Sequence, residues 1–347
     1  MSVRRQLGRS AIAVPPLCMG TMTFGRMVEE ERAHTLMSLA ADRGVDFFDT
    51  GEMYPAPAPD AESYGRTERM IGRWLKARGR RDELLIATKV VGNAPYTAHI
   101  RVGRNRLDRA TLRAAIEGSL GRLGTDYVDL FQLHWPDRKT NAIMQLGYVH
   151  AAEDDPVPIA ETLDALDELV REGKVRAIGL SNETPWGVWR FLDASERLGL
   201  ERIASVQNAY SLLARSYEIG LAEFAHREDV PLIGYQPLAM GMLSGIYEDG
   251  ALPPGRRLTR HPHARYTSPA ARRATSAYVA LARAHGLDPA EMAVAFAASR
   301  PFMASLIIAG TEPAQLEGSI AAASMPLSAE LLAGIELIHR DNSNPSQ

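Results

Sequence analysis

Short apolar segments alternate with longer amphipathic segments along nearly the whole chain. Apolar runs of this length are typical of parallel strands that a sheet buries on both faces. They predict eight strands, at residues 17–20, 47–49, 84–89, 128–134, 175–180, 205–207, 231–235 and 306–309. The amphipathic segments have a helical period, and several begin at Asp or Pro or end before Gly. They predict helices at residues 30–43, 67–78, 108–123, 159–172, 185–198, 217–227, 269–285, 289–299 and 313–323, with a further helix at 328–340.

These elements form eight strand–helix units, and residues 3–14 read as a short β-hairpin. We therefore expect an α/β fold, a (β/α)8 TIM barrel with an N-terminal β-hairpin and an extra C-terminal helix. The alternative is an open doubly wound sheet, which usually carries a Gly-x-Gly-x-x-Gly turn after its first strand. That turn is absent from the sequence. No linker or repeat divides the chain, so we expect a single domain spanning residues 1–347.

The composition of the chain indicates which kinds of partner it is not expected to bind. The chain has 347 residues, of which 46% are hydrophobic, and a net charge of −3 with a pI near 6.3. A basic surface for nucleic acid is therefore not expected. Cys18 is the only cysteine, which fits a reducing compartment. No segment approaches the roughly 18–20 apolar residues that span a bilayer. We expect a cytoplasmic protein with no membrane or nucleic-acid partner, and a homo-oligomer remains an open alternative.

Three successive predicted strands end in residues that can move or steer a proton. They are Asp49, Lys89 and His134, and Tyr54 follows Asp49 by five residues. A charged group at the end of an apolar strand is costly unless that end opens onto a pocket. In a β/α barrel the carboxyl ends of the strands share one rim, where catalytic groups collect. The pattern therefore predicts a catalytic pocket at this rim.

Each of these residues, taken alone, also has a structural interpretation. A tyrosine after a strand is usually an amphipathic packing residue, and an Asp before Thr-Gly is common in turns. A histidine before Trp-Pro can bond to backbone inside the core. Only their joint occurrence, in this order, favours catalysis.

Metal binding is not expected from the sequence. The nine histidines and one cysteine show no His-Glu-x-x-His or clustered thiol spacing. The closest cluster, His261-Pro262-His263, reads as a solvated loop without a carboxylate beside it in the sequence.

Asp49, Tyr54, Lys89 and His134, in this order and setting, resemble the catalytic tetrad of the aldo-keto reductases. The resemblance covers essentially the whole chain. It extends through residues 20–25, 122–129, 179–182, 206–208 and 235–238. Residues 49–55, 134–136 and 181–184 look most like the Tas-type branch of that family, which lies near the potassium-channel β subunits.

The resemblance implies a role for each residue of this tetrad. Tyr54 would be the general acid that protonates a carbonyl oxygen, and a phenol with a pKa near 10 is a sluggish acid at neutral pH. Lys89 would lower the pKa of that phenol, because a nearby cation favours phenolate. Asp49 would pair with Lys89 and hold it in place. His134 would donate to the carbonyl oxygen and orient it.

The family also implies a nicotinamide cofactor. After the fifth, sixth and seventh strands, its members hold the carboxamide and stack an aromatic ring on the nicotinamide. A loop of small residues then cradles the pyrophosphate with backbone N–H groups, and a later helix N-terminus holds the adenosine end. Carried over in chain order, the cofactor residues are Gly20, Thr21, Met22, Ser181, Asn182, Gln207, Tyr235, Gln236, Pro237, Leu238, Ala239, Gly241, Leu243, Arg257, Ala309, Gly310, Thr311 and Gln315.

The sequence departs from the family pattern where a 2′-phosphate would bind. Ile246 stands where relatives often have lysine, and Glu312 lies where a basic residue is common. Gly318 and Ser319 replace a Glu and an Asn. NADPH remains the expected cofactor, and NADH is the alternative.

The resemblance also implies a small-molecule aldehyde or ketone as substrate, and Met53 and Trp135 would give the pocket an apolar wall. The predicted function is NADPH-dependent reduction of the carbonyl to an alcohol, with Tyr54 as general acid. The alternative is an NADP-binding regulatory subunit that senses redox state and turns over slowly, as potassium-channel β subunits do. We also expect the long loop at 239–268 to fold over bound cofactor.

Overall fold

A closed barrel of eight parallel strands forms the centre of the protein, in a computed structural model that describes residues 3–56, 61–101, 105–143 and 145–346. Each strand pairs with its neighbours in sequence, and the last strand pairs with the first. This confirms the predicted (β/α)8 barrel. The strands are β3 (Leu17–Gly20), β4 (Phe47–Asp49), β5 (Leu85–Val90), β6 (Leu130–Leu133), β7 (Ile178–Ser181), β8 (Ile203–Ala209), β9 (Leu232–Tyr235) and β10 (Met303–Ile308).

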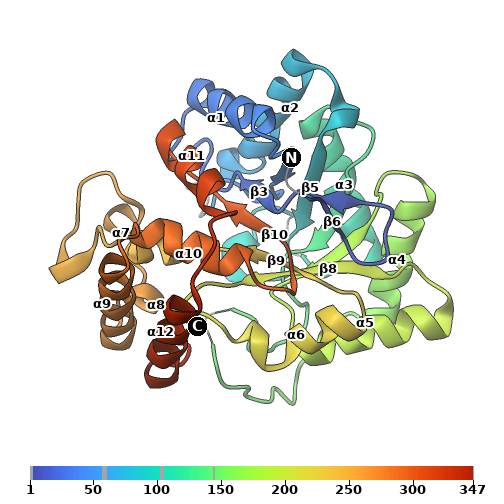
Figure 1. The fold of residues 1–347 in the computed structure, drawn as a ribbon. Helices are drawn as coiled ribbons and strands as arrows, with labels where there is room; N and C mark the ends of the chain where they lie inside the picture. The colour runs from blue at the N-terminus through green and yellow to red at the C-terminus, as the bar shows by residue number, and fades with distance from the viewer. Residues whose placement is uncertain (1–2, 57–60, 102–104, 144, 347) are drawn as a thin grey trace.

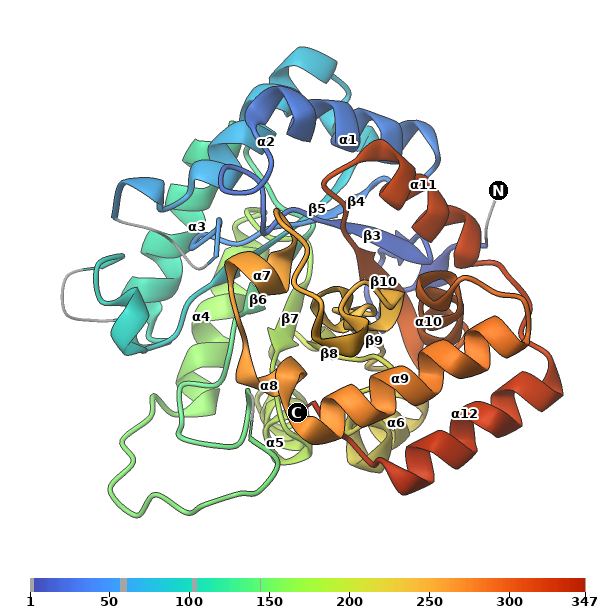
Figure 2. The same ribbon diagram turned by 90° about the vertical axis from the view of Figure 1, so that its left-hand side faces the viewer.

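Helices surround the barrel (Figures 1 and 2). Both ends of each long helix lie within one residue of the predicted bounds, and in several of these helices local caps mark the ends. Asp108, for example, accepts a hydrogen bond from the Thr111 N–H at 2.9 Å, and Gly124 takes the left-handed conformation after the same helix, at φ 65°. These helices are α1 (Glu30–Asp42), α2 (Arg66–Arg78), α3 (Arg109–Leu123), α4 (Ile159–Arg171), α5 (Pro185–Leu198), α6 (Tyr217–Arg227), α9 (Pro269–Ala284), α10 (Pro289–Ala298), α11 (Pro313–Ala322) and α12 (Ala329–Asp341).

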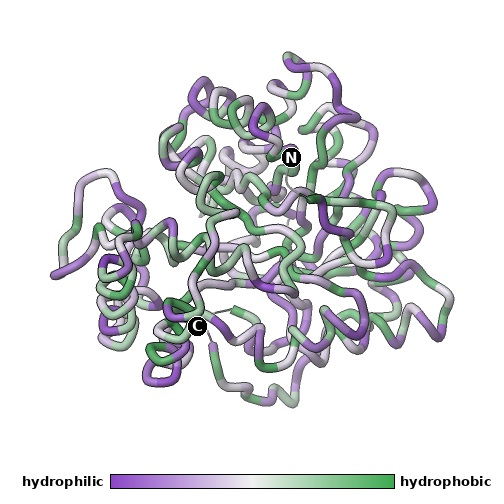
Figure 3. Tube along the Cα trace, viewed as in Figure 1, coloured by the Kyte–Doolittle hydropathy of each residue, from purple (hydrophilic) through white to green (hydrophobic). Residues whose placement is uncertain are grey.

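The predicted hairpin closes the amino-terminal end of the barrel. Its strands, β1 (Arg5–Gln6) and β2 (Ala13–Val14), pair antiparallel. Leu7, Ile12 and Val14 are buried against apolar residues of the barrel strands, among them Cys18 and Phe47. In Figure 3 the strands are mostly hydrophobic, while hydrophilic residues recur along the outer helices. The interior of the barrel is therefore filled at this end.

The carboxyl-terminal end of the barrel is partly covered by short helical segments. Residues 239–268, expected as a loop, contain η4 (Ala239–Ser244), η5 (Glu248–Gly250), α7 (Arg257–Arg260) and α8 (Ala264–Thr267). In Figure 2, α7 lies in front of the barrel strands. Segments of three to six residues are too short for a helical period to repeat, so the sequence pattern could not predict them. Other short turns are η1 (Ala61–Ser63), η2 (Arg81–Glu83) and η3 (Pro95–Thr97).

Residues 57–60, in the connection between β4 and α2, lie outside the described residues. Over the described parts of the chain, every helix is too short or too polar to cross a membrane. The long connections that follow β4, β6 and β9 all leave the same end of the barrel, as the sequence predicts for a parallel arrangement.

Candidate active site

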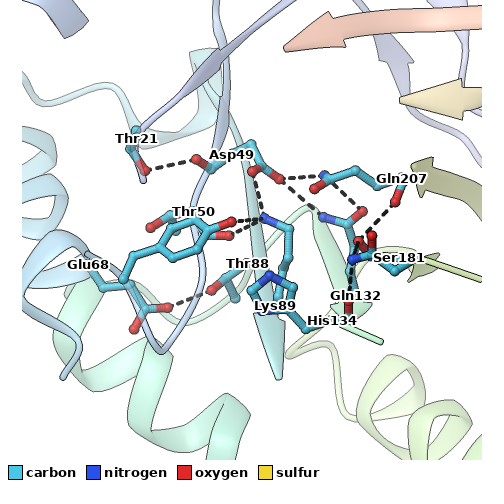
Figure 4. Close-up of polar contacts among 12 residues, drawn as sticks. Thr21, Asp49, Thr50, Glu68, Thr88, Lys89, Gln132, His134, Ser181 and Gln207 are labelled. Atoms are coloured by element: carbon cyan, nitrogen blue, oxygen red, sulfur yellow. Dashed lines mark hydrogen bonds and ion pairs between the residues drawn. The ribbon is translucent and has the colours of Figure 1, made fainter. Parts of the chain in front are cut away.

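Asp49, Lys89 and His134 lie at the carboxyl ends of β4, β5 and β6, which are neighbours in the barrel. The Lys89 ammonium is fully buried and donates to Asp49 Oδ2 at 2.6 Å and to the Thr50 carbonyl at 2.7 Å. Figure 4 shows Lys89 with its partners Asp49 and Thr50. The ammonium also donates to Tyr54 Oη at 3.4 Å. The four residues that the sequence singled out thus meet in one cluster.

Tyr54 is positioned by the turn that follows β4. The turn is closed by a hydrogen bond from the Tyr54 N–H to the Gly51 carbonyl at 2.9 Å. The tyrosine ring packs with Met53, Val91 and Trp135 in a small apolar cluster. It also meets the His134 ring edge-on, with ring centroids 5.7 Å apart. Packing on several sides leaves the hydroxyl facing Lys89.

Burial and charge oppose each other in the Lys89–Tyr54 pair. Burial alone would lower the pKa of Lys89, but the Asp49 carboxylate and Tyr54 outweigh it, so that pKa is raised and the lysine is charged at neutral pH. Burial raises the pKa of Tyr54, and Lys89 only partly offsets this. The lowering effect expected of Lys89 is therefore present, but it does not bring the pKa of Tyr54 below its ordinary value. Its phenol is protonated at neutral pH.

His134 is a neutral imidazole. Burial, with a smaller effect of the Lys89 charge, holds its pKa well below the usual value. Its Nδ1 is buried and has no hydrogen-bond partner among the described residues. A buried N–H without an acceptor is costlier than an unfilled acceptor, so the ring proton belongs on Nε2. The histidine can therefore donate from Nε2.

A cavity of about 780 Å³ opens above this cluster. Asp49, Tyr54 and His134 line it, whereas Lys89 lies behind them. The two residues expected in the substrate pocket, Met53 and Trp135, also line it. So do most of the expected cofactor residues, namely Gly20, Thr21, Met22, Ser181, Asn182, Gln207, Tyr235, Gln236, Pro237, Leu238, Gly241, Arg257, Ala309, Gly310, Thr311 and Gln315.

Hydrogen bonds join Ser181, Asn182 and Gln207, the residues that the resemblance implies would hold a carboxamide. Gln207 Nε2 donates to Asp49 Oδ1 at 2.7 Å, and the Gln207 carbonyl accepts from Ser181 Oγ at 2.9 Å. The Tyr235 hydroxyl donates to Asn182 Oδ1 at 2.5 Å. Gln207 therefore contacts the Lys89–Asp49 ion pair directly as well as the cavity.

Gln132 is a site residue that the sequence analysis missed. It is fully buried on β6, donates to Asp49 Oδ1 at 3.3 Å and accepts from Gln207 Nε2 at 3.3 Å. The signal was an amide within an apolar strand, two residues before His134 and hence on the same face. Asp49 Oδ1 therefore accepts from two amides while Oδ2 accepts from Lys89.

Two residues expected around the pyrophosphate do not line the cavity. Ala239 and Leu243 are buried in the hydrophobic core. Their N–H groups donate to the carbonyls of Gln236 and Leu238, and the Gly241 N–H also donates to Leu238. Because the turn uses these donors itself, they are not free to cradle a phosphate in this conformation.

Arg257, on α7, is the cation best placed for an anion in the cavity. Its side chain is half-buried and lines the cavity, and the described residues provide no ion pair to it. Burial lowers its pKa. An unpaired, partly buried guanidinium is costly unless a ligand compensates it. The donor set therefore fits a bound phosphate.

Ile246 and Glu312, which were expected to weaken the binding of a 2′-phosphate, differ in whether they line the cavity. Ile246 lines the cavity, so the missing cation there is a real difference. Glu312 does not line it and forms an ion pair with Arg32. Its carboxylate therefore points to Arg32 rather than into the cavity. Glu291, which the sequence analysis did not single out, lines the cavity.

Comparison with known proteins places the chain in a family. The model of the Aldo/keto reductase family matches residues 16–340. Protein Tas of Escherichia coli (strain K12) is 43% identical over 342 residues, 98% of this chain and 99% of that protein. An aldo-keto reductase of Babesia bovis is 37% identical over 240 residues, 65% of this chain and 84% of that protein.

A probable voltage-gated potassium channel subunit beta of Arabidopsis thaliana is 27% identical over 314 residues, 88% of this chain and 87% of that protein. The predicted resemblance, including its Tas-type branch, is therefore confirmed. With a closed (β/α)8 barrel and a family match across nearly its whole length, the chain belongs to the aldo/keto reductase family and is an oxidoreductase.

Proposed function

We propose that the protein reduces aldehydes and ketones to alcohols with NADPH, and that Tyr54 is the general acid. The observation that carries this proposal is the Tyr54 hydroxyl, which faces the cavity 3.4 Å from the Lys89 ammonium and beside the His134 ring. Reduction adds a hydride to the carbonyl carbon, which the reduced nicotinamide supplies when bound, and a proton to the oxygen. The protein's own residues must deliver that proton.

The charges in the cluster suit proton delivery. Tyr54 is protonated at neutral pH because burial raises its pKa, so it holds the proton that the carbonyl oxygen needs. As the proton leaves, the adjacent Lys89 ammonium stabilises the phenolate that forms. Asp49 keeps the lysine charged and fixed in place. His134 donates from Nε2 and orients the carbonyl.

Residues expected at the nicotinamide end and at the adenosine end of a dinucleotide line the same cavity. Ser181, Asn182 and Gln207 would hold the nicotinamide carboxamide, and Arg257 would meet the phosphates. Arg257 is the reason to propose NADPH as the preferred cofactor. The preference over NADH would be smaller than with a lysine at position 246, because Ile246 supplies no cation. Aldehydes and ketones with apolar groups would pack against Met53 and Trp135. A cytoplasmic location is also proposed, because the single cysteine, Cys18, is free and buried.

The alternative is a regulatory subunit that binds NADP and turns over slowly. It is kept because a potassium channel subunit is among the similar proteins. The experiment that separates the two mixes the protein with NADPH and a panel of aldehydes and ketones. Multiple turnovers, seen as continued loss of NADPH absorbance, support the reductase. A single turnover with cofactor retained through gel filtration would contradict it and support the regulatory subunit.

A further inference from the structure

Glu52, between Asp49 and Tyr54, has a fully buried side chain in which each oxygen accepts two hydrogen bonds. Oε1 accepts from the Val91 N–H at 2.8 Å and from Arg101 Nη2 at 2.7 Å. Oε2 accepts from Arg101 Nη1 at 2.6 Å and from the Tyr64 hydroxyl at 2.8 Å. A buried carboxylate with this many donors is held in one geometry.

The same residue attaches the tyrosine-bearing turn to β5 and to the residue that follows it. The Glu52 N–H donates to the Lys89 carbonyl at 3.1 Å, while its carboxylate accepts from the N–H of Val91, directly after the strand. The turn continues directly to Tyr54. Movement of Glu52 would therefore change the 3.4 Å separation between Tyr54 Oη and Lys89 Nζ.

Arg101 secures this arrangement from the segment that follows β5. Its side chain is 17% exposed, and burial alone would lower its pKa, but the ion pair with Glu52 outweighs this and raises it. The preceding residue, Ile100, packs against the cluster of Met53, Tyr54, Val91 and Trp135. Arg101 thus supplies the charge that lets a carboxylate be buried two residues from Tyr54.

We propose that Glu52 and Arg101 are positioning residues for Tyr54, which hold its hydroxyl at the distance from Lys89 that proton delivery requires. Neither residue lines the cavity, so neither contacts substrate or cofactor there. The role rests on the proposed function of Tyr54 as acid. A positioning role predicts an effect that a purely structural role does not. Loosening the Glu52–Arg101 ion pair should slow proton transfer specifically.

The test compares Arg101→Met with the wild type in the reduction of an aldehyde by NADPH, under conditions where the chemical step limits turnover. Misplacing an acid by about 1 Å can cost about 10²-fold, so kcat should fall by up to that factor. NADPH binding, measured by tryptophan quenching, should not change. The solvent deuterium isotope effect on kcat should rise, because proton transfer becomes slower. Arg101→Lys, which keeps the cation, should recover part of kcat.

The matched control is Arg113→Met. Arg113 forms a bidentate pair with Glu172, at 2.9 and 2.6 Å, on the exposed surface of α3. This change should leave kcat and the isotope effect as in the wild type. If Arg101→Met does not fold, two other variants test the positioning role. They are Tyr64→Phe, which removes one donor to Glu52, and Arg101→Lys. A lower kcat with a larger isotope effect in both supports the proposal.

Unchanged kcat and isotope effect in folded Arg101→Met, or in both substitutes, would overturn the positioning role. Tyr54→Phe, assayed in parallel, separates this failure from failure of the proposed function. If Tyr54→Phe loses turnover while Arg101→Met does not, only the positioning role fails. If Tyr54→Phe retains full turnover, the proposed acid itself is wrong.

Discussion

Replacing Lys89 with methionine tests the ion pair at the centre of the cluster. The ammonium is fully buried and donates to Asp49 Oδ2 at 2.6 Å and to the Thr50 carbonyl at 2.7 Å. Methionine has a similar length but no charge. Asp49, which is 3% exposed, would keep as donors, among the residues that the structure describes, only the amides of Gln132 and Gln207.

Removing one partner of a buried ion pair typically costs about 3–5 kcal/mol, because the remaining charge is left without compensation. We therefore expect Lys89→Met to lose that much unfolding free energy. Adding Asp49→Asn removes the stranded charge and should recover most of the loss. The remainder should be about 1 kcal/mol, the worth of the hydrogen bond that the Thr50 carbonyl no longer accepts.

Urea unfolding followed by tryptophan fluorescence measures both variants, and the same samples are assayed for aldehyde reduction. Both should be nearly inactive, because neither retains a cation beside Tyr54. The stability gain of the double variant is thus separated from activity. If Lys89→Met/Asp49→Asn were no more stable than Lys89→Met, the reasoning about an uncompensated carboxylate would be refuted.

Two further predictions concern the cofactor. Ile246→Lys should strengthen the binding of NADPH more than that of NADH, because it adds a charge-assisted contact to the 2′-phosphate; tryptophan quenching with both cofactors measures this, and equal strengthening would contradict it. Amides of residues 239–268 should exchange with deuterium more slowly when NADP is bound, since the segment is expected to close over the cofactor and limit its release. Identical exchange with and without NADP would rule out that coupling.

The barrel and its helix ends were predictable because their signals are local. Asp108 and Gly124 mark the ends of α3 in the sequence and cap it in the structure. Parallel strands in sequence order bring Asp49, Lys89 and His134 to one rim without knowledge of any side-chain contact. The expectation of a single domain stays a prediction, as do the roles of the tetrad.

What the sequence could not predict depends on contacts between distant segments. Arg101 meets Glu52 across 49 residues, and Gln132 meets Asp49 across 83. The net direction of the Tyr54 pKa shift depends on how completely packing excludes water, which overcame the effect of Lys89. Similarly, the N–H groups of Ala239, Gly241 and Leu243 are consumed by a turn whose conformation no residue pattern specifies.

The central claim is that Tyr54 gives a proton to the substrate. Tyr54→Phe removes one hydroxyl and keeps the packed ring, so the fold and cofactor binding should be preserved. The matched control is Tyr96→Phe, because Tyr96 also lines the cavity and its ring contacts Trp135. The decisive measurement is the rate of aldehyde reduction by NADPH under conditions where the chemical step limits turnover. We predict a fall of about 10²–10⁴-fold for Tyr54→Phe and little change for Tyr96→Phe; a wild-type rate in Tyr54→Phe would contradict the mechanism.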